Sequence, residues 1–230
     1  MLKSALRDFI SLIYPHTCFA CKRLLVRGEK FICTHCHYKL PVTDYHQNPD
    51  NELQRRFWGK VPLKYTFAYL HFVRGGRVQK LLHNLKYGNA PGISEFLGNN
   101  YGRMLMKSGY KGLFDLVTAV PLHPAKLRKR GYNQSEGFAK GISVNLGAAF
   151  STSVLRRTVA TSTQTKKNRM ARWKNVETVF APCKGIDLKE QRVLIIDDVL
   201  TTGSTLEACA NVLLANGCKE VSIAVIAAAA

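Results

Sequence analysis

Two adjacent acidic residues and a run of small residues just after them form the segment with the clearest chemical potential. Asp197 and Asp198 follow the aliphatic run Val193–Ile196, and Thr201–Thr205 begins after two intervening residues. An all-aliphatic run is typical of a parallel strand buried on both faces. Open α/β folds bind their ligands at the carboxyl ends of such strands. The sequence therefore predicts a ligand site over residues 197–205.

The composition of residues 201–205 is that of an anion-binding loop. Gly203 permits close approach to the backbone, and the N–H groups at the start of the following helix attract a phosphate. The other side chains add hydroxyl donors: Thr201, Thr202, Ser204 and Thr205. Asp197 and Asp198 would repel that phosphate, so they suit vicinal hydroxyls or a Mg²⁺ ion beside it. A phosphate at one end and a diol at the other describe ribose 5-phosphate.

Four of the seven cysteines form two C-x-x-C pairs separated by eleven residues: Cys18, Cys21, Cys33 and Cys36. In a reducing compartment this spacing predicts a structural Zn²⁺ site in which all four thiolates are ligands. Two disulfides or four unligated thiols are the alternatives.

The chain is strongly basic, with 34 Lys+Arg against 15 Asp+Glu and a formal net charge of +19. Between Asp115 and Glu177 lie twelve basic residues and a single acid, Glu136. This concentration predicts an anionic partner, although a solvated charged face is the alternative. Nucleic acid, a phosphorylated small molecule and an acidic membrane surface would all fit this charge. The candidate nucleic-acid contacts are Arg128, Arg130, Lys166 and Lys167.

Length and composition limit the class of protein. At 230 residues, with 46% hydrophobic and 21% charged residues, the chain is expected to form one globular domain and a small appendage. Its longest apolar stretch, 221–230, is about half of what a transmembrane helix requires. No signal peptide is apparent, so we expect a cytoplasmic protein without a transmembrane segment.

The elements expected around these residues define three regions. Residues 1–45 are expected to hold a helix ending at Tyr14 and the zinc finger, residues 46–64 a linker, and residues 65–230 an α/β domain with a parallel sheet. Ser204 and Glu207 have the spacing of a capping box, which predicts that Ser204 caps a helix. The expected strands are 65–72, 115–120, 193–196 and 219–227, and the expected helices begin near 78, 93, 138 and 204.

The thirteen residues 193–205 resemble the phosphoribosyl-pyrophosphate motif of type I phosphoribosyltransferases. Several other segments, together with the paired C-x-x-C, resemble the ComF family of competence-associated proteins: Lys86–Gly88, Val120–His123, Arg128–Gln134, Thr163-Gln164 and 169–180. The resemblance implies a type I phosphoribosyltransferase-like parallel sheet flanked by helices, with a small N-terminal zinc-binding module.

The resemblance also implies roles for individual residues. Asp197 and Asp198 would face the ribose hydroxyls, and residues 201–205 would hold the 5-phosphate. Pro121 and Leu122 would lie in the pyrophosphate loop. A segment over about 158–176 would close over the site and bring Arg169 and Arg172 to the reacting groups. Phosphoribosyl pyrophosphate would bind with Mg²⁺.

Two functions are expected from these features. One is transfer of a phosphoribosyl group to an unidentified base or amine, through an oxocarbenium-like state stabilised by positioned charges. The other is the handling of single-stranded DNA during DNA uptake, the setting that the ComF resemblance implies. An ATPase in which Ile195–Asp198 ends a Walker B strand is disfavoured, because the sequence contains no G-x-x-x-x-G-K-[ST] loop.

Overall fold

A five-stranded sheet forms the centre of the molecule, and every pairing in it is parallel. The computed structural model describes residues 16–88, 90–158 and 179–229. The strand order is β1-β7-β6-β2-β3, and a separate antiparallel pair joins β4 to β5. The strands are β1 (Thr66–Phe72), β2 (Leu116–Ala119), β3 (Ala149–Phe150), β4 (Leu155–Arg157), β5 (Phe180–Pro182), β6 (Arg192–Leu200) and β7 (Glu220–Ala229). The expected parallel α/β sheet is confirmed.

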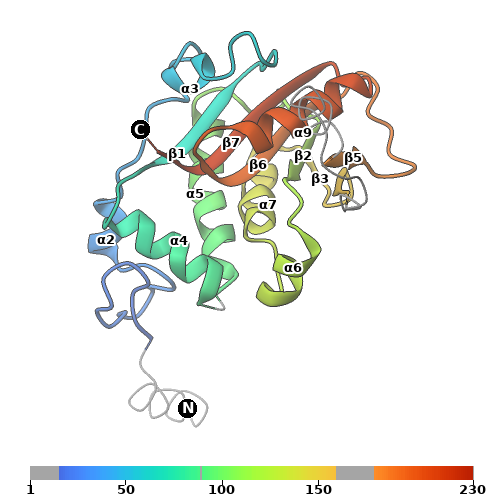
Figure 1. Cartoon of the computed structure of the whole chain (residues 1–230). Coiled ribbons are helices and arrows are strands. Elements are labelled where there is room, and N and C mark those ends of the chain that lie inside the picture. The colour runs from blue at the N-terminus through green and yellow to red at the C-terminus, as the bar shows by residue number, and fades with distance from the viewer. Residues whose placement is uncertain (1–15, 89, 159–178, 230) are drawn as a thin grey trace.

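Helices cover both faces of this sheet (Figure 1). One hydrophobic cluster lies between the sheet and α4, α5 and α7. A second cluster, on the other face, includes residues of α3 and α9. The described helices are α2 (Thr34–Tyr38), α3 (Glu52–Arg55), α4 (Arg77–Tyr87), α5 (Gly92–Lys107), α6 (Pro124–Arg130), α7 (Gln134–Leu146) and α9 (Ser204–Ala215).

The ends of α7 follow from local sequence. Asn133 precedes the helix, and its side chain accepts a hydrogen bond from the Ser135 N–H at 3.1 Å. Gly147 follows it in the left-handed conformation (φ +71°), which costs glycine little.

The predicted cap of α9 is wrong. Ser204 is the first helical residue, and Gly203 (φ +82°) stands at the cap position without a side-chain hydrogen bond. The capping-box spacing is local, whereas the turn is fixed by how Gly203 packs in three dimensions, as described below.

Residues 46–64, predicted as a linker, contain α3 and pack against the sheet. Leu53 and Phe57 are almost completely buried in the second cluster. The buried Asn51 amide donates to the carbonyl oxygens of Tyr45 and Thr66, and its oxygen caps α3. The helix expected to end at Tyr14 lies outside the described residues.

None of the helices in the described ranges combines the length and the apolar character needed to cross a bilayer.

Candidate functional site

The acid pair lies where the sheet opens at the carboxyl end of β6. Ala119, the last residue of β2, pairs with Ile196. The next residue of β6, Asp197, therefore has no partner residue in β2. On the other side β6 continues to pair with β7 as far as Leu200. A small pocket follows, lined by Asp197 and residues 199–206. The topology therefore places the carboxylates beside the predicted anion loop.

Asp198 is already held by two donors from other elements. Lys86 Nζ lies 2.8 Å from Asp198 Oδ2, and Gln134 Nε2 donates to the same oxygen at 2.9 Å. These donors come from the last turn of α4 and the first residue of α7. The Lys86 and Asp198 side chains are 25% and 15% exposed, so the pair is largely shielded from solvent.

The surroundings of Asp197 favour its protonated form. Burial and the charge of neighbouring Asp198 raise the pKa of Asp197 to about 7, although the Asp198 N–H donates to Asp197 Oδ1 at 2.8 Å. A carboxyl group with a pKa near neutrality changes charge in the physiological range, which is common at binding sites.

Gly203 is fixed by two independent constraints. Its φ of +82° is the left-handed conformation, and a Cβ placed there would lie 2.8 Å from Phe57 Cζ. The buried ring of Phe57 thus supports the loop from the α3 side. Around Gly203 the hydroxyl-bearing side chains are exposed: Thr201, Thr202, Ser204 and Thr205. The arrangement presents backbone N–H groups and hydroxyls together.

The segment that links β2 to α7 is tied to neighbouring elements by side-chain hydrogen bonds. Pro121 and Leu122 follow β2 after one intervening residue, Val120, and both are partly exposed. The Asn133 amide donates to the carbonyl oxygen of Val120 at 3.0 Å, and the Tyr132 hydroxyl donates to that of Leu85. These bonds tie the segment to β2 and α4.

Arg130 connects this segment to the acid pair. Its guanidinium donates to Gln134 Oε1 at 3.1 Å and lies 5.5 Å from the centroid of the exposed Tyr87 ring. Gln134 in turn donates to Asp198, so Arg130 acts on the acid through one intervening side chain.

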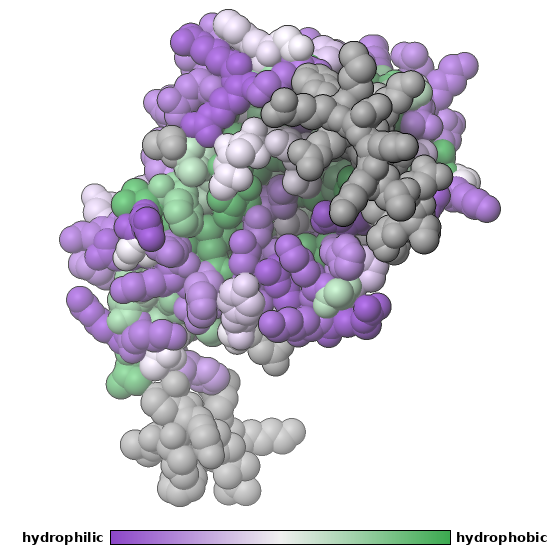
Figure 2. Space-filling view, viewed as in Figure 1, coloured by the Kyte–Doolittle hydropathy of each residue, from purple (hydrophilic) through white to green (hydrophobic). Residues whose placement is uncertain are grey.

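Helix α6 buries none of its seven residues, and four of the seven are basic. The four are Lys126, Arg128, Lys129 and Arg130. Hydrophilic side chains cover the end of the molecule where this helix lies (Figure 2). The other predicted site residues, Lys166, Lys167, Arg169 and Arg172, lie outside the described residues, as does most of the predicted closing segment.

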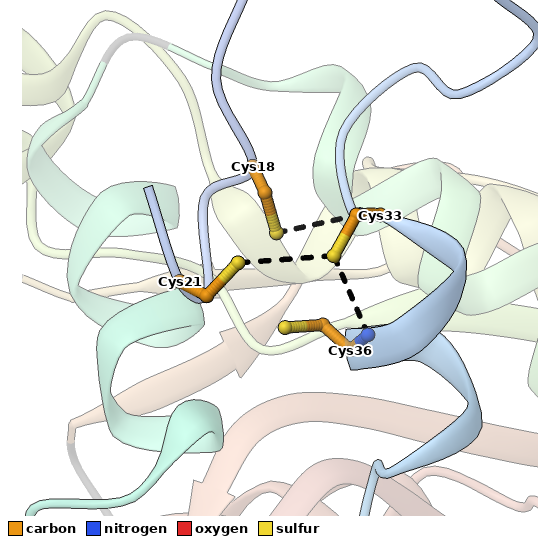
Figure 3. A group of neighbouring side chains, drawn as sticks. All are labelled: Cys18, Cys21, Cys33 and Cys36. Carbon is orange, nitrogen blue, oxygen red and sulfur yellow. Dashed lines mark hydrogen bonds between the residues drawn. The ribbon is translucent and has the colours of Figure 1, made fainter. Parts of the chain in front are cut away.

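The four N-terminal cysteine sulfurs converge in one cluster (Figure 3). All lie within 4.8 Å of one another, and none forms a disulfide. Cys21 Sγ and Cys33 Sγ are 3.7 Å apart. Sulfurs on a tetrahedral Zn²⁺ with Zn–S bonds of about 2.3 Å would be separated by about 3.8 Å. The donor set and spacing can therefore hold a metal ion.

The ionisation of the cluster favours a cation. Burial would raise the pKa of Cys18, but N–H groups of Cys33, Ala20 and Cys21 donate to it and bring the pKa to about 7. Burial and the neighbouring thiols raise the pKa of Cys36 to about 12. Four thiolates at this distance therefore require a compensating positive charge.

Comparisons with known proteins agree with this arrangement. A family model described as "Phosphoribosyl transferase domain" matches residues 121–230. The "DNA utilization protein YhgH" of Escherichia coli is 28% identical over 214 residues, which are 90% of this chain and 87% of that protein. The "Competence protein F" of Haemophilus influenzae is 28% identical over 110 residues, covering 47% and 48% of the two chains. These matches support the resemblance to the ComF family. The sheet of this chain is that of a type I phosphoribosyltransferase.

Among solved structures, a glutamine phosphoribosylpyrophosphate amidotransferase from B. subtilis is 21% identical with a TM-score of 0.41, and the match covers 58% of this chain and 26% of that enzyme.

Three residues of this site were not among the sequence candidates. Lys86 and Gln134 bind Asp198, and Phe57 packs under Gly203. Lys86 and Gln134 stand inside segments that carry the ComF resemblance, which was a usable signal. Phe57 gives no such signal, because only the fold brings it to residue 203.

Proposed function

We propose that this chain binds phosphoribosyl pyrophosphate with Mg²⁺ at the carboxyl end of β6. The supporting observation is that the acid pair and the loop around Gly203 adjoin where β2 ends and β6 continues. Asp197 and Asp198 would accept hydrogen bonds from the ribose hydroxyls. Residues 201–205 would bind the 5-phosphate through backbone N–H groups and hydroxyls. Mg²⁺ would neutralise charge on the pyrophosphate.

The test is calorimetry with phosphoribosyl pyrophosphate and Mg²⁺. We expect micromolar binding by the unmodified protein and its loss in the double variant Asp197→Asn/Asp198→Asn. The control is Asp187→Asn, an exposed acid that precedes β6 at its amino end. No binding at millimolar ligand by folded, metal-loaded protein would refute the proposal.

We further propose that single-stranded DNA binds at α6 and that the protein acts in DNA uptake. The names of the two relatives refer to DNA utilization and to competence. On this chain the supporting observation is the exposed basic helix itself. Four cations on a helix with no buried residue suit a phosphate backbone.

The salt dependence of DNA affinity distinguishes binding at α6 from attraction by the net charge of the protein. Replacing Arg128 and Arg130 by Ala should lower the slope of log affinity against log salt by about 1.4, from two lost phosphate contacts. The matched control removes two exposed cations near the end of α5, Lys107→Ala/Lys111→Ala. Equal effects of both variants would refute a specific role for α6. The Asp197/Asp198 double variant should bind DNA normally.

A catalytically active phosphoribosyltransferase for an unidentified base or amine, without a DNA role, is the alternative. It is supported by the family model matched over 121–230. Pyrophosphate release that requires an added acceptor, together with unmeasurable DNA binding, would favour it.

A further inference from the structure

We propose that Lys86 of α4 binds the pyrophosphate group of the ligand, a role that rests on the proposed phosphoribosyl-pyrophosphate site. Lys86 lies in a segment outside the region that matches the phosphoribosyltransferase family model, which begins at residue 121. Within the described residues, Lys86 is the cation that forms an ion pair with one of the two site aspartates, Asp198.

The first argument is the position of Lys86 relative to the two faces of the sheet. Phe57 and the first turn of α9, which frame the phosphate loop, belong to the hydrophobic cluster on one face. Helix α4 packs into the cluster on the opposite face through Leu82 and Leu85. The carboxylates of β6 lie between these two clusters. Lys86 therefore approaches them from the side opposite to the phosphate loop.

The second argument is the shape of the ligand. In phosphoribosyl pyrophosphate the 5-phosphate and the 1-pyrophosphate are attached at opposite ends of the ribose, with the diol between them. A ligand whose 5-phosphate lies in the 201–205 loop and whose diol faces Asp197 and Asp198 would direct its pyrophosphate toward the α4 side. Lys86 Nζ is already within 2.8 Å of Asp198 there.

The third argument is charge. The turn after β2, Val120–Leu122, has no cationic side chain. Two carboxylates beside a pyrophosphate would repel it unless a cation stands between them. Lys86 carries a compact charge with three donors on a flexible stem, so it can contact Asp198 and a phosphate oxygen together or exchange one for the other. Arg130 is more constrained, because Gln134 and the Tyr87 ring already hold its guanidinium.

The experiment compares two ligands that differ only in the pyrophosphate. Binding of phosphoribosyl pyrophosphate and of ribose 5-phosphate, each with Mg²⁺, is measured calorimetrically for the unmodified protein and for Lys86→Gln, Lys86→Arg and Lys80→Gln. Lys80 is an exposed lysine of the same helix without an ion pair among the described residues, so its variant controls for net charge. Thermal unfolding verifies that each variant is folded.

We expect Lys86→Gln to weaken phosphoribosyl pyrophosphate binding about tenfold or more and ribose 5-phosphate binding less than about threefold. Lys86→Arg should retain most of the affinity, and Lys80→Gln should change neither ligand. Equal losses for both ligands would overturn the inference, because Lys86 would then act only through Asp198. Unchanged binding in Lys86→Gln would also overturn it. If the unmodified protein binds phosphoribosyl pyrophosphate and Lys86→Gln binds it equally well, this inference fails alone. If the unmodified protein does not bind phosphoribosyl pyrophosphate, the proposed function fails and this inference fails with it.

Discussion

At the scale of single residues, Asp197 has a cost in stability that its binding role would explain. Its pKa is about 7, against 3.8 for an ordinary aspartate, because it is buried beside Asp198. Between about pH 4 and pH 7 the folded protein keeps a proton that the unfolded chain has lost. Stability relative to a non-ionising side chain therefore falls as pH rises through this window and is constant above it.

Asp197→Asn should accordingly raise the midpoint of thermal unfolding, and by more at pH 8 than at pH 5. Unfolding followed by circular dichroism at both pH values provides the measurement. A gain of the same size at both would contradict an elevated pKa. The same variant should bind no phosphoribosyl pyrophosphate, so stability and binding should change in opposite directions.

Gly203→Ala is predicted to destabilise the protein through both of the constraints described above. An alanine held in the left-handed backbone conformation lowers the free energy of unfolding by about 1–3 kcal/mol. Its Cβ would also clash with Phe57. Gly185→Ala is the matched control, because Gly185 has φ +78° and no atom within 4 Å of an added Cβ. Chemical denaturation should show a larger loss for Gly203→Ala. Equal losses in the free energy of unfolding would mean that the Phe57 side chain moves aside to accommodate the added Cβ.

At the scale of elements, α4 joins the cysteine cluster to the acid pair. Asn84 donates to the carbonyl oxygen of Phe19 at 2.8 Å, and Lys86, two residues later, holds Asp198. The ring of Phe31 packs against Gly92 at the start of α5, where an added Cβ would lie 2.5 Å from it. The N-terminal module is thus packed on the helices that border the site.

We therefore predict that Cys33→Ser removes bound zinc and weakens the whole fold. The metal content should fall from about one equivalent to well below one, and the unfolding midpoint should fall by about 5 °C for a loss of about 2 kcal/mol. Cys183→Ser, outside the cluster, should change neither quantity. Unchanged metal content in Cys33→Ser would contradict the four-cysteine site.

At the scale of the whole molecule, the predicted boundary at residue 65 can be tested directly. Leu53 and Phe57 are buried against the domain, and Asn51 bonds to Thr66 at the start of β1. A fragment of residues 65–230 should therefore unfold at a lower temperature than the full chain or aggregate. A fragment as stable as the full chain would show that residues 46–64 are a linker after all.

The sequence was informative where the determinants are local and weaker where they are distant. Hydrophobic runs and glycines predicted β1, β2, β6 and the end of α7, because strand burial and helix termination depend on neighbouring residues. The cap of α9 was missed because it depends on Phe57 meeting Gly203 across the fold. The packing of residues 46–64 was missed because Leu53 and Phe57 are buried against distant parts of the chain. Lys86 was noted only within a resemblance, since its partner Asp198 is far away in the chain.

The strand order has a consequence for how the chain folds as it is synthesised. β7 lies between β1 and β6, and the contact of Tyr65 with Ser222 spans 157 positions in the sequence. At about 5–20 residues per second, a ribosome needs roughly 8–30 s to make that stretch. Throughout this time β1 has no partner in the sheet and exposes an apolar strand edge. Nascent chains should therefore depend on chaperones that shield β1 until β7 emerges.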